Sequence, residues 1–151
     1  MNEHNHDSSP NKTAASATLH CLTGCAIGEV LGMILSTAFA WSAAPSIAIS
    51  ILLAFVFGYS LTMRPLLSSG IALKRALKLA LAADTASIAV MELADNGFIL
   101  AIPGAINAGL NTVLFWNSLL ISLVVAFAVA FPLNKYLISR GKGHAVMHEY
   151  H

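Results

Sequence analysis

The chain has 151 residues, of which 57% are hydrophobic and only 10% are charged, and its formal net charge is +1. Soluble domains carry about one quarter charged residues, so this composition excludes an ordinary soluble protein. A near-neutral charge without a basic stripe also excludes a nucleic-acid partner. The length fits one domain, and we expect an all-α integral membrane protein in the lipid bilayer.

Four apolar stretches follow a polar beginning. Residues 1–17, rich in Asn, Ser, His and Ala, predict a disordered tail. About 20 apolar residues cross a hydrocarbon core of roughly 30 Å as a helix. The expected spans are about Thr18–Trp41, Pro45–Met63, Lys78–Gly97 (or on to Ile102) and Ala108–Leu133. We therefore predict a compact four-helix membrane domain over 18–133, with a turn at Pro103-Gly104 and a basic, His-bearing tail over 134–151.

The basic residues predict the orientation of this bundle. All eight lie before the first span, between the second and third spans, or after the fourth: Lys12, Arg64, Lys74, Arg75, Lys78, Lys135, Arg140 and Lys142. The positive-inside rule then places both termini in the cytoplasm, and we expect a multi-pass protein of the bacterial inner (plasma) membrane. The alternative has three spans and a re-entrant 97–111 segment, which would move the C-terminal tail outside and break the rule.

Four of the seven carboxylates lie inside the apolar stretches: Glu29, Asp84, Glu92 and Asp95. A charge at the centre of a bilayer costs about 2.5–3.5 kcal/mol on insertion scales, so such residues are candidates for a functional site. No Lys or Arg lies at a matching depth. Bound cations, bound protons or water must therefore compensate the four acids.

The first apolar stretch carries a set of metal-ligand types. His20, Cys21, Cys25 and Glu29 combine donors that suit Zn(II) or Cu(I). One helix cannot complete a tetrahedral site, so we expect further ligands from another span or another copy. The two cysteines also fit a redox pair, although thiols one helical turn apart rarely reach disulfide geometry.

Three glycines occupy the neighbouring face of the same helix. Gly24, Gly28 and Gly32 recur every fourth residue and predict close helix packing of the small-xxx-small type. The ridge also indicates self-association, so we expect a homo-oligomer or a larger membrane complex.

Acidic residues form one face of the third predicted helix. Asp84, Glu92 and Asp95 share it with Ser87 and Met91. The three acids are expected to line a path or to complete metal coordination, and Glu29 should lie between Asp84 and Glu92 in depth. The alternative for Asp95 is a loop near water.

Histidines gather in both tails. His4 and His6 form a pair in the first tail, and His144, His148 and His151 follow a helical spacing in the last. We interpret them as candidate metal-collecting residues on the cytoplasmic side. The alternative is a set of solvated side chains.

Three runs carry a family resemblance: HCLTGCAIGEVLG (20–32), AADTASIAVMELADN (82–96) and PLNKYLISRGKGHAVMH (132–148). They resemble an uncharacterised bacterial multi-span membrane domain family of unknown function, whose members are sometimes associated with copper-oxidase-type proteins. The resemblance implies a helical membrane domain and favours copper. It implies no catalytic residue.

The leading hypothesis is a small membrane protein that binds, and transports or hands over, a Cu or Zn ion. One alternative is a membrane thiol redox protein that uses Cys21 and Cys25. Another is a non-catalytic assembly subunit of a larger membrane complex.

Overall fold

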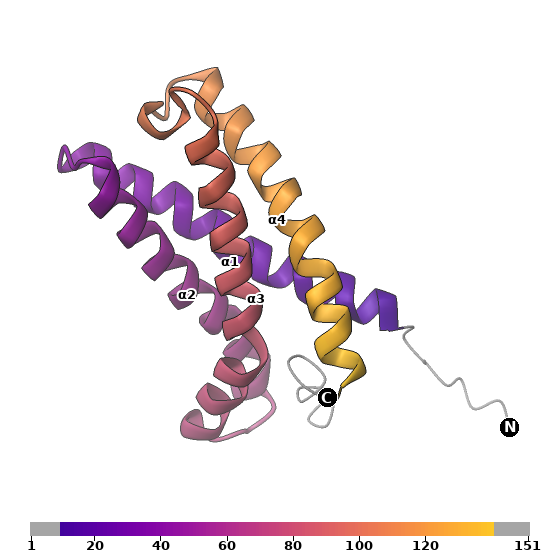
Figure 1. The fold of residues 1–151 in the computed structure, drawn as a ribbon. Coiled ribbons are helices and arrows are strands. Elements are labelled where there is room, and N and C mark those ends of the chain that lie inside the picture. Colours follow the sequence, from indigo (N-terminus) through magenta and orange to yellow (C-terminus); the bar gives the residue numbers. More distant parts are fainter. Residues whose placement is uncertain (1–9, 141–151) are drawn as a thin grey trace, which may run out of the picture.

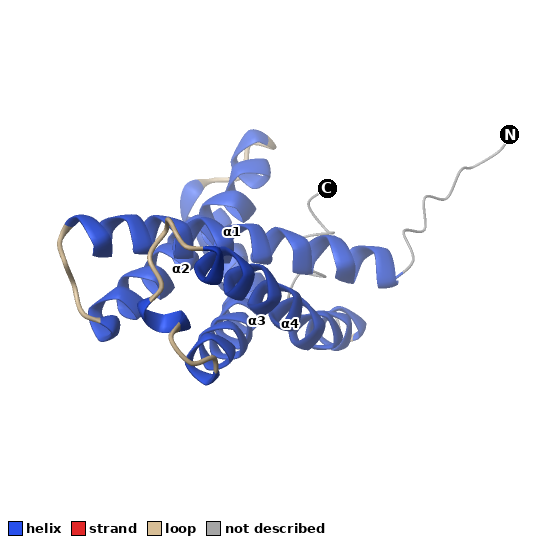
Figure 2. Cartoon of the chain, turned by 90° about the horizontal axis from the view of Figure 1, so that it is seen from above, coloured by secondary structure: helices blue, strands red, loops and turns tan. Residues whose placement is uncertain are grey.

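The computed structural model describes residues 10–140, and this part of the chain is all-helical. Its elements, in chain order, are α1 (Pro10–Ala38), α2 (Ala43–Ser68), α3 (Leu73–Ala101), the short 3-10 helix η1 (Ala105–Asn107) and α4 (Val113–Ser139). Successive long helices run in opposite directions, and α1 crosses behind α3 and α4 at a steep angle (Figure 1). Seen from above, the long helices gather around a common centre (Figure 2).

The helices pack mainly with their neighbours in sequence. The most extensive contact joins α1 to α2, and α3 packs chiefly on α4. A direct contact also joins α1 and α3 across the bundle. This diagonal contact brings two helices that carry ionisable residues together.

Three helices are long and apolar enough to cross a membrane: Asn11–Ala38, Ala43–Ser68 and Val113–Ser139. Large apolar side chains on their outer faces, such as Leu52 and Val124, are exposed. A soluble protein would bury most of these side chains, whereas lipid accepts them. The described part of the chain is thus that of a membrane protein. Helix α3 carries three carboxylates and is not one of these three apolar helices.

The two ends of the bundle differ in charge. The start of α1, the end of α2, the start of α3 and the end of α4 share one end, which we call the basic end (Figure 1). All seven described basic residues lie towards this end and are exposed: Lys12, Arg64, Lys74, Arg75, Lys78, Lys135 and Arg140. The opposite end holds the α1–α2 loop and the α3–α4 connection, and none of the described Lys and Arg residues lies there.

The expected tail boundaries are wrong on both sides. Residues 10–17 belong to α1 and are not disordered, and Ala14 and Ala17 are buried. Alanine is the strongest helix former, and Pro10 suits a first helical turn, where its missing N–H costs nothing. The polar composition concealed these first turns of α1. At the other side, residues 134–139 continue α4.

The connections also differ from the expected ones in detail. Helix α2 continues to Ser68, beyond the expected Met63, and α3 begins at Leu73, ahead of the membrane span expected from Lys78. Helix α3 then passes through Gly97 without a break, which excludes the expected alternative of a loop at Asp95. The turn at Pro103-Gly104 is present, with Gly104 at a φ of 81°. Helix α4 begins at Val113, where the Thr112 hydroxyl accepts a bond of 3.2 Å from the Phe115 amide.

The glycine ridge of α1 packs against α2 of the same chain. A Cβ added to Gly24 would lie 2.7 Å from the Cα of Gly58, and one added to Gly28 would lie 2.6 Å from the Cα of Ala54. Gly32 meets Ser50 in the same way. Because α2 covers this ridge, the glycines no longer argue for contact with a second copy.

Because α1 and α2 approach so closely, one added methyl group should markedly lower the free energy of unfolding. Replacing Gly28 by Ala should destabilise the fold by about 1–3 kcal/mol, because the backbone of α2 must move away. Gly97→Ala is the matched control, since nothing lies within 4 Å of a Cβ there. It should be neutral or gain about 0.5–1 kcal/mol. Thermal unfolding in mild detergent measures both, and equal melting temperatures for the two variants would contradict the packing described.

Candidate functional site

Helix α1 uses two adjacent faces for two different neighbours. The glycines face α2, while Cys21, Cys25 and Glu29 recur every fourth residue beside them. Residues with this spacing lie above one another on a helix. Both thiols are free and buried, and Glu29 is also buried.

Helix α3 presents its acidic face to the interior of the bundle. Asp84, Glu92 and Asp95 are only 0%, 3% and 1% exposed, and Ser87 and Met91 on the same face are buried. The outer face carries leucines instead, and Leu93 is 76% exposed. The mixed polar stripe expected from the sequence is therefore an interior surface.

The two helices meet through three acid-containing pairs. The Cys21 thiol donates to Oδ1 of Asp84 over 3.7 Å, and Thr62 of α2 lies beside the same aspartate. Further along, Cys25 lies against Glu92, and Glu29 lies against Asp95. We call these six residues of α1 and α3 the acid–thiol seam: Cys21, Asp84, Cys25, Glu92, Glu29 and Asp95.

The register of the seam differs from the expected depth order. Glu29 lies level with Asp95 and not between Asp84 and Glu92. The expected spans start at Thr18 and Lys78, but the helices begin at Pro10 and Leu73. The start of α1 differs from the expected one by more residues than the start of α3 does. Relative to the acids of α3, Glu29 therefore lies farther from the basic end than expected.

The charges of the seam are poorly compensated by the described residues. Helix α1 has no Lys or Arg after Lys12, and α3 has none after Lys78. Oε2 of Glu92 accepts a bond of 3.2 Å from the Asn96 amide. Within residues 10–140, Oε1 of Glu92 and both carboxylate oxygens of Asp95 have no hydrogen-bond partner. Such buried acceptors normally bind a proton, an ion or water.

A second polar network lies beside the Cys21–Asp84 pair of the seam. Nδ2 of Asn134 in α4 donates to the Thr18 hydroxyl and to the Ser87 hydroxyl, both over 3.0 Å. Thr18 in turn donates to the carbonyl of Ala14 over 2.7 Å. All three side chains are almost fully buried. One amide thus links α1, α3 and α4 beside the Cys21–Asp84 pair.

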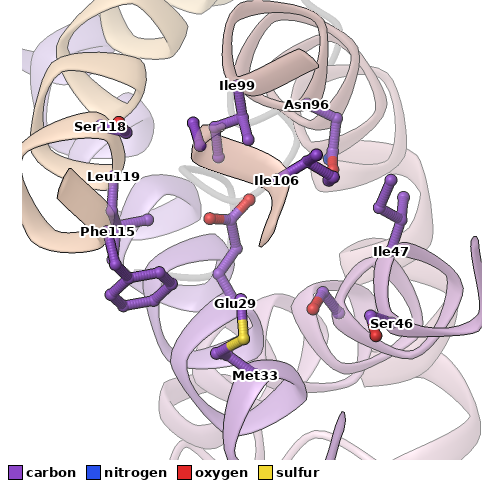
Figure 3. A pocket seen from close by; sticks show the side chains of 12 residues that line it. Glu29, Met33, Ser46, Ile47, Asn96, Ile99, Ile106, Phe115, Ser118 and Leu119 are labelled. Atoms are coloured by element: carbon purple, nitrogen blue, oxygen red, sulfur yellow. The ribbon is translucent and has the colours of Figure 1, made fainter. Parts of the chain in front are cut away.

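At the other end the seam opens into a pocket of about 60 Å³. Residues of all four long helices and of η1 line it, and its polar members are Glu29, Ser46, Ser50, Asn96 and Ser118. The carboxylate of Glu29 points into this space, between Ile106 and Phe115 (Figure 3). A water needs about 10–15 Å³ of such volume, so the pocket has room for several waters.

The structure does not assemble the expected metal ligands into one centre. Within residues 10–140, no three His, Cys, Asp or Glu side chains converge closely enough to hold a metal ion. His20 lies beside Leu61 of α2, on a different face from Cys21. The remaining expected ligands (Cys21, Cys25, Glu29, Asp84, Glu92 and Asp95) are distributed as pairs. His144, His148 and His151 lie outside the described residues.

Sequence reasoning missed several polar partners. Asn134 falls at the start of the expected C-terminal tail, but it is 1% exposed and holds three helices together. Thr62 of α2 lies beside Asp84. Asn96, one turn further along α3, bonds Glu92. The signal was present for Asn96, which follows Glu92 by four residues. For Asn134 and Thr62 the partner lies on another helix, so no local pattern marks them.

Fold and site together define a class: a small helical membrane protein with buried acids and thiols in one seam. The chain belongs to the family described as a domain of unknown function (DUF4396), whose family model matches residues 11–143. That description names no activity, metal or association with copper oxidases. No match was found among curated proteins or among solved structures.

The Asn134 network predicts a specific loss of stability. Asn134→Ala removes two interhelical hydrogen bonds and leaves a gap, so the fold should lose about 1–2 kcal/mol. Ser139→Ala is the control, since among the described residues the exposed Ser139 hydroxyl bonds the Tyr136 carbonyl of its own helix and no other helix. Thermal unfolding in detergent compares the two variants. A loss at Ser139 as large as that at Asn134 would mean that the network does not stabilise the bundle.

Proposed function

We propose that the protein is a four-span protein of the bacterial inner membrane, with both termini in the cytoplasm, that binds and moves a cation through the acid–thiol seam. A transition-metal ion, Cu(I) or Zn(II), is the proposed cargo. The single observation that carries the proposal is a row of buried acids and thiols between α1 and α3. Among the described residues of these two helices, no Lys or Arg follows Lys12 or Lys78.

The outer face of α3 supports a fourth span. From Leu81 to Leu100 its exposed residues are uncharged, and Leu81, Leu93 and Leu100 all face outward. This stretch is about 30 Å long at 1.5 Å per residue, which matches the hydrocarbon core. The carboxylates that lower its hydropathy point inward, away from lipid.

The charge of the two ends supports the proposed orientation. Every described Lys and Arg lies towards the basic end, and the positive-inside rule assigns that end to the cytoplasm. The pocket at Glu29 would then open towards the outside.

The donor chemistry supports a transition metal over a hard ion. Thiolates prefer Cu(I) and Zn(II), whereas a site for Mg²⁺ or Ca²⁺ would consist of oxygen ligands alone. Each pair of the seam offers two donors. An ion at Cys21–Asp84 or Cys25–Glu92 therefore needs neighbouring side chains to turn towards it, or ligands from a second copy. Successive pairs spaced along α1 would suit transfer between weak sites better than permanent storage.

The redox alternative is less well supported. Thiol exchange needs an accessible thiolate, and the two cysteines are only 0% and 1% exposed beside carboxylates. The assembly alternative depended on a free glycine ridge, which α2 covers.

The topology has a direct test. In a Cys21→Ser/Cys25→Ser background, a cysteine introduced at Ser69 should be protected from an impermeant thiol reagent in intact cells. A cysteine introduced at Asn111, in the α3–α4 connection, should react. Both sites are exposed, so permeabilised cells provide the control for intrinsic reactivity. The same labelling for both positions would refute a membrane-spanning α3.

The cargo is tested by metal content. Protein purified without affinity histidines in mild detergent, under reducing conditions, is loaded with Cu(I) or Zn(II) and analysed by mass spectrometry. Near-stoichiometric metal is expected, with at least about tenfold weaker binding in the Cys21→Ser/Cys25→Ser variant, because soft ions lose their thiolate donors.

Thr23→Ser is the matched control for this loss, since Thr23 lies between the two cysteines on the exposed face of α1. Unchanged metal content in the cysteine variant, or no uptake by the native protein, would rule out the thiols as ligands.

A further inference from the structure

We propose that Met91 is the third sulfur ligand of a Cu(I) site that it forms with Cys21 and Cys25. The inference rests on the proposed function, in which the seam carries Cu(I) or Zn(II), and it selects Cu(I) between the two ions. It also assigns a role to a residue of α3 that is not one of the six residues of the acid–thiol seam.

The first argument is the position of the three sulfur-containing side chains. Cys21 and Cys25 of α1 and Met91 of α3 belong to one buried cluster, and they are 0%, 1% and 0% exposed. The other buried members of this cluster have side chains without any donor atom: Ala54, Ile88, Ala126 and Ala130. Within this cluster the metal-binding atoms of the buried side chains are therefore three sulfurs.

The second argument is the register of α1 and α3, which both start at the basic end (Figure 1). The bond from the Cys21 thiol to Asp84 joins the two helices at one level. From that level, Cys25 lies about 6 Å further along α1 and Met91 about 10 Å further along α3, at 1.5 Å per residue. The long side chain of a helical methionine points back towards the N-terminus of its helix. The Met91 thioether thus reaches back towards the level of Cys25.

The third argument is the chemistry of the donor set. Thiolate and thioether sulfurs are soft ligands, and together they suit Cu(I). Zn(II) instead takes Cys, His and carboxylate ligands in a four-coordinate site. A site that Met91 completes should therefore prefer Cu(I), whereas Zn(II) would draw its further ligands from the carboxylates of Asp84 or Glu92.

The fourth argument is the ability of Met91 to turn towards an ion. Each pair of the seam offers two donors, so a bound ion needs one more side chain. Methionine is unbranched and has three rotatable bonds, which lets its sulfur adjust without a backbone movement. On binding, Cu(I) replaces the two thiol protons, which leave for the solvent. The Met91 sulfur shares a lone pair and loses no proton, and copper stays in the Cu(I) state throughout.

X-ray absorption at the copper edge tests the assignment directly. Selenomethionine labelling distinguishes methionine from cysteine, because selenium scatters differently from sulfur. The labelled full chain in mild detergent, loaded anaerobically with one equivalent of Cu(I), should show a selenium atom bound to copper. Native protein whose copper has sulfur neighbours but no selenium neighbour would overturn the Met91 site and leave the thiols as ligands.

Met91→Leu should lose the copper–selenium signal. Met63→Leu is the matched control and should keep it, since Met63 packs against a different buried cluster. A signal that persists in Met91→Leu would assign the selenium to another methionine and overturn the proposal.

Binding affinities separate a ligand from a side chain that only fills space. Competition with a chromophoric chelator should show Cu(I) binding at least about tenfold weaker in Met91→Leu, with Zn(II) binding unchanged. Leucine has about the volume of methionine, so the packing of the cluster is largely retained. A packing role alone predicts equal losses for both ions or no loss for either, and each of these results would refute Met91 as a ligand.

The same measurements distinguish this inference from the proposed function. Zn(II) uptake that depends on the cysteines, without uptake of Cu(I), would overturn the Met91 site and leave the proposed cation function in place. Native protein that takes up neither ion would overturn both.

Discussion

The close contact between the backbones of α1 and α2 fixes the geometry of the rest of the bundle. Gly24 and Gly28 bring α1 directly onto Gly58 and Ala54. Because side chains four residues apart share a face, this contact turns the neighbouring face, with its cysteines and Glu29, towards α3. Larger residues at the glycine positions would rotate or displace α1, and the pairs of the seam would lose their register.

The acid–thiol seam lowers the stability of a bilayer protein, and this destabilisation is the strongest indication that the seam has a function. Buried carboxylates without basic partners destabilise a fold unless a proton, an ion or water compensates them. In this bundle four acids and two thiols line one interhelical contact, while the outer face of α3 from Leu81 to Leu100 stays uncharged. A purely structural helix contact would use small apolar residues, as α1 and α2 do.

The seam divides into two chemical regions. Towards the basic end, each thiol faces a carboxylate, and the Asn134 network joins α1, α3 and α4 beside the Cys21–Asp84 pair. Towards the opposite end, two carboxylates face each other beside a polar pocket. Soft-ion binding is the proposed chemistry of the first region.

The sequence by itself determined the helical class, the polar face of α3 and the glycine ridge of α1, because these depend on periodicity along one helix. It also placed every described basic residue towards one end. Only the tertiary structure decided that α2 covers the ridge, that Glu29 meets Asp95, and that Asn134 joins three helices. Such contacts depend on where helices start and how they rotate against each other. Residues 10–17 illustrate this dependence. They were expected to be disordered but form the start of α1, and the expected depth of Glu29 was wrong as a result.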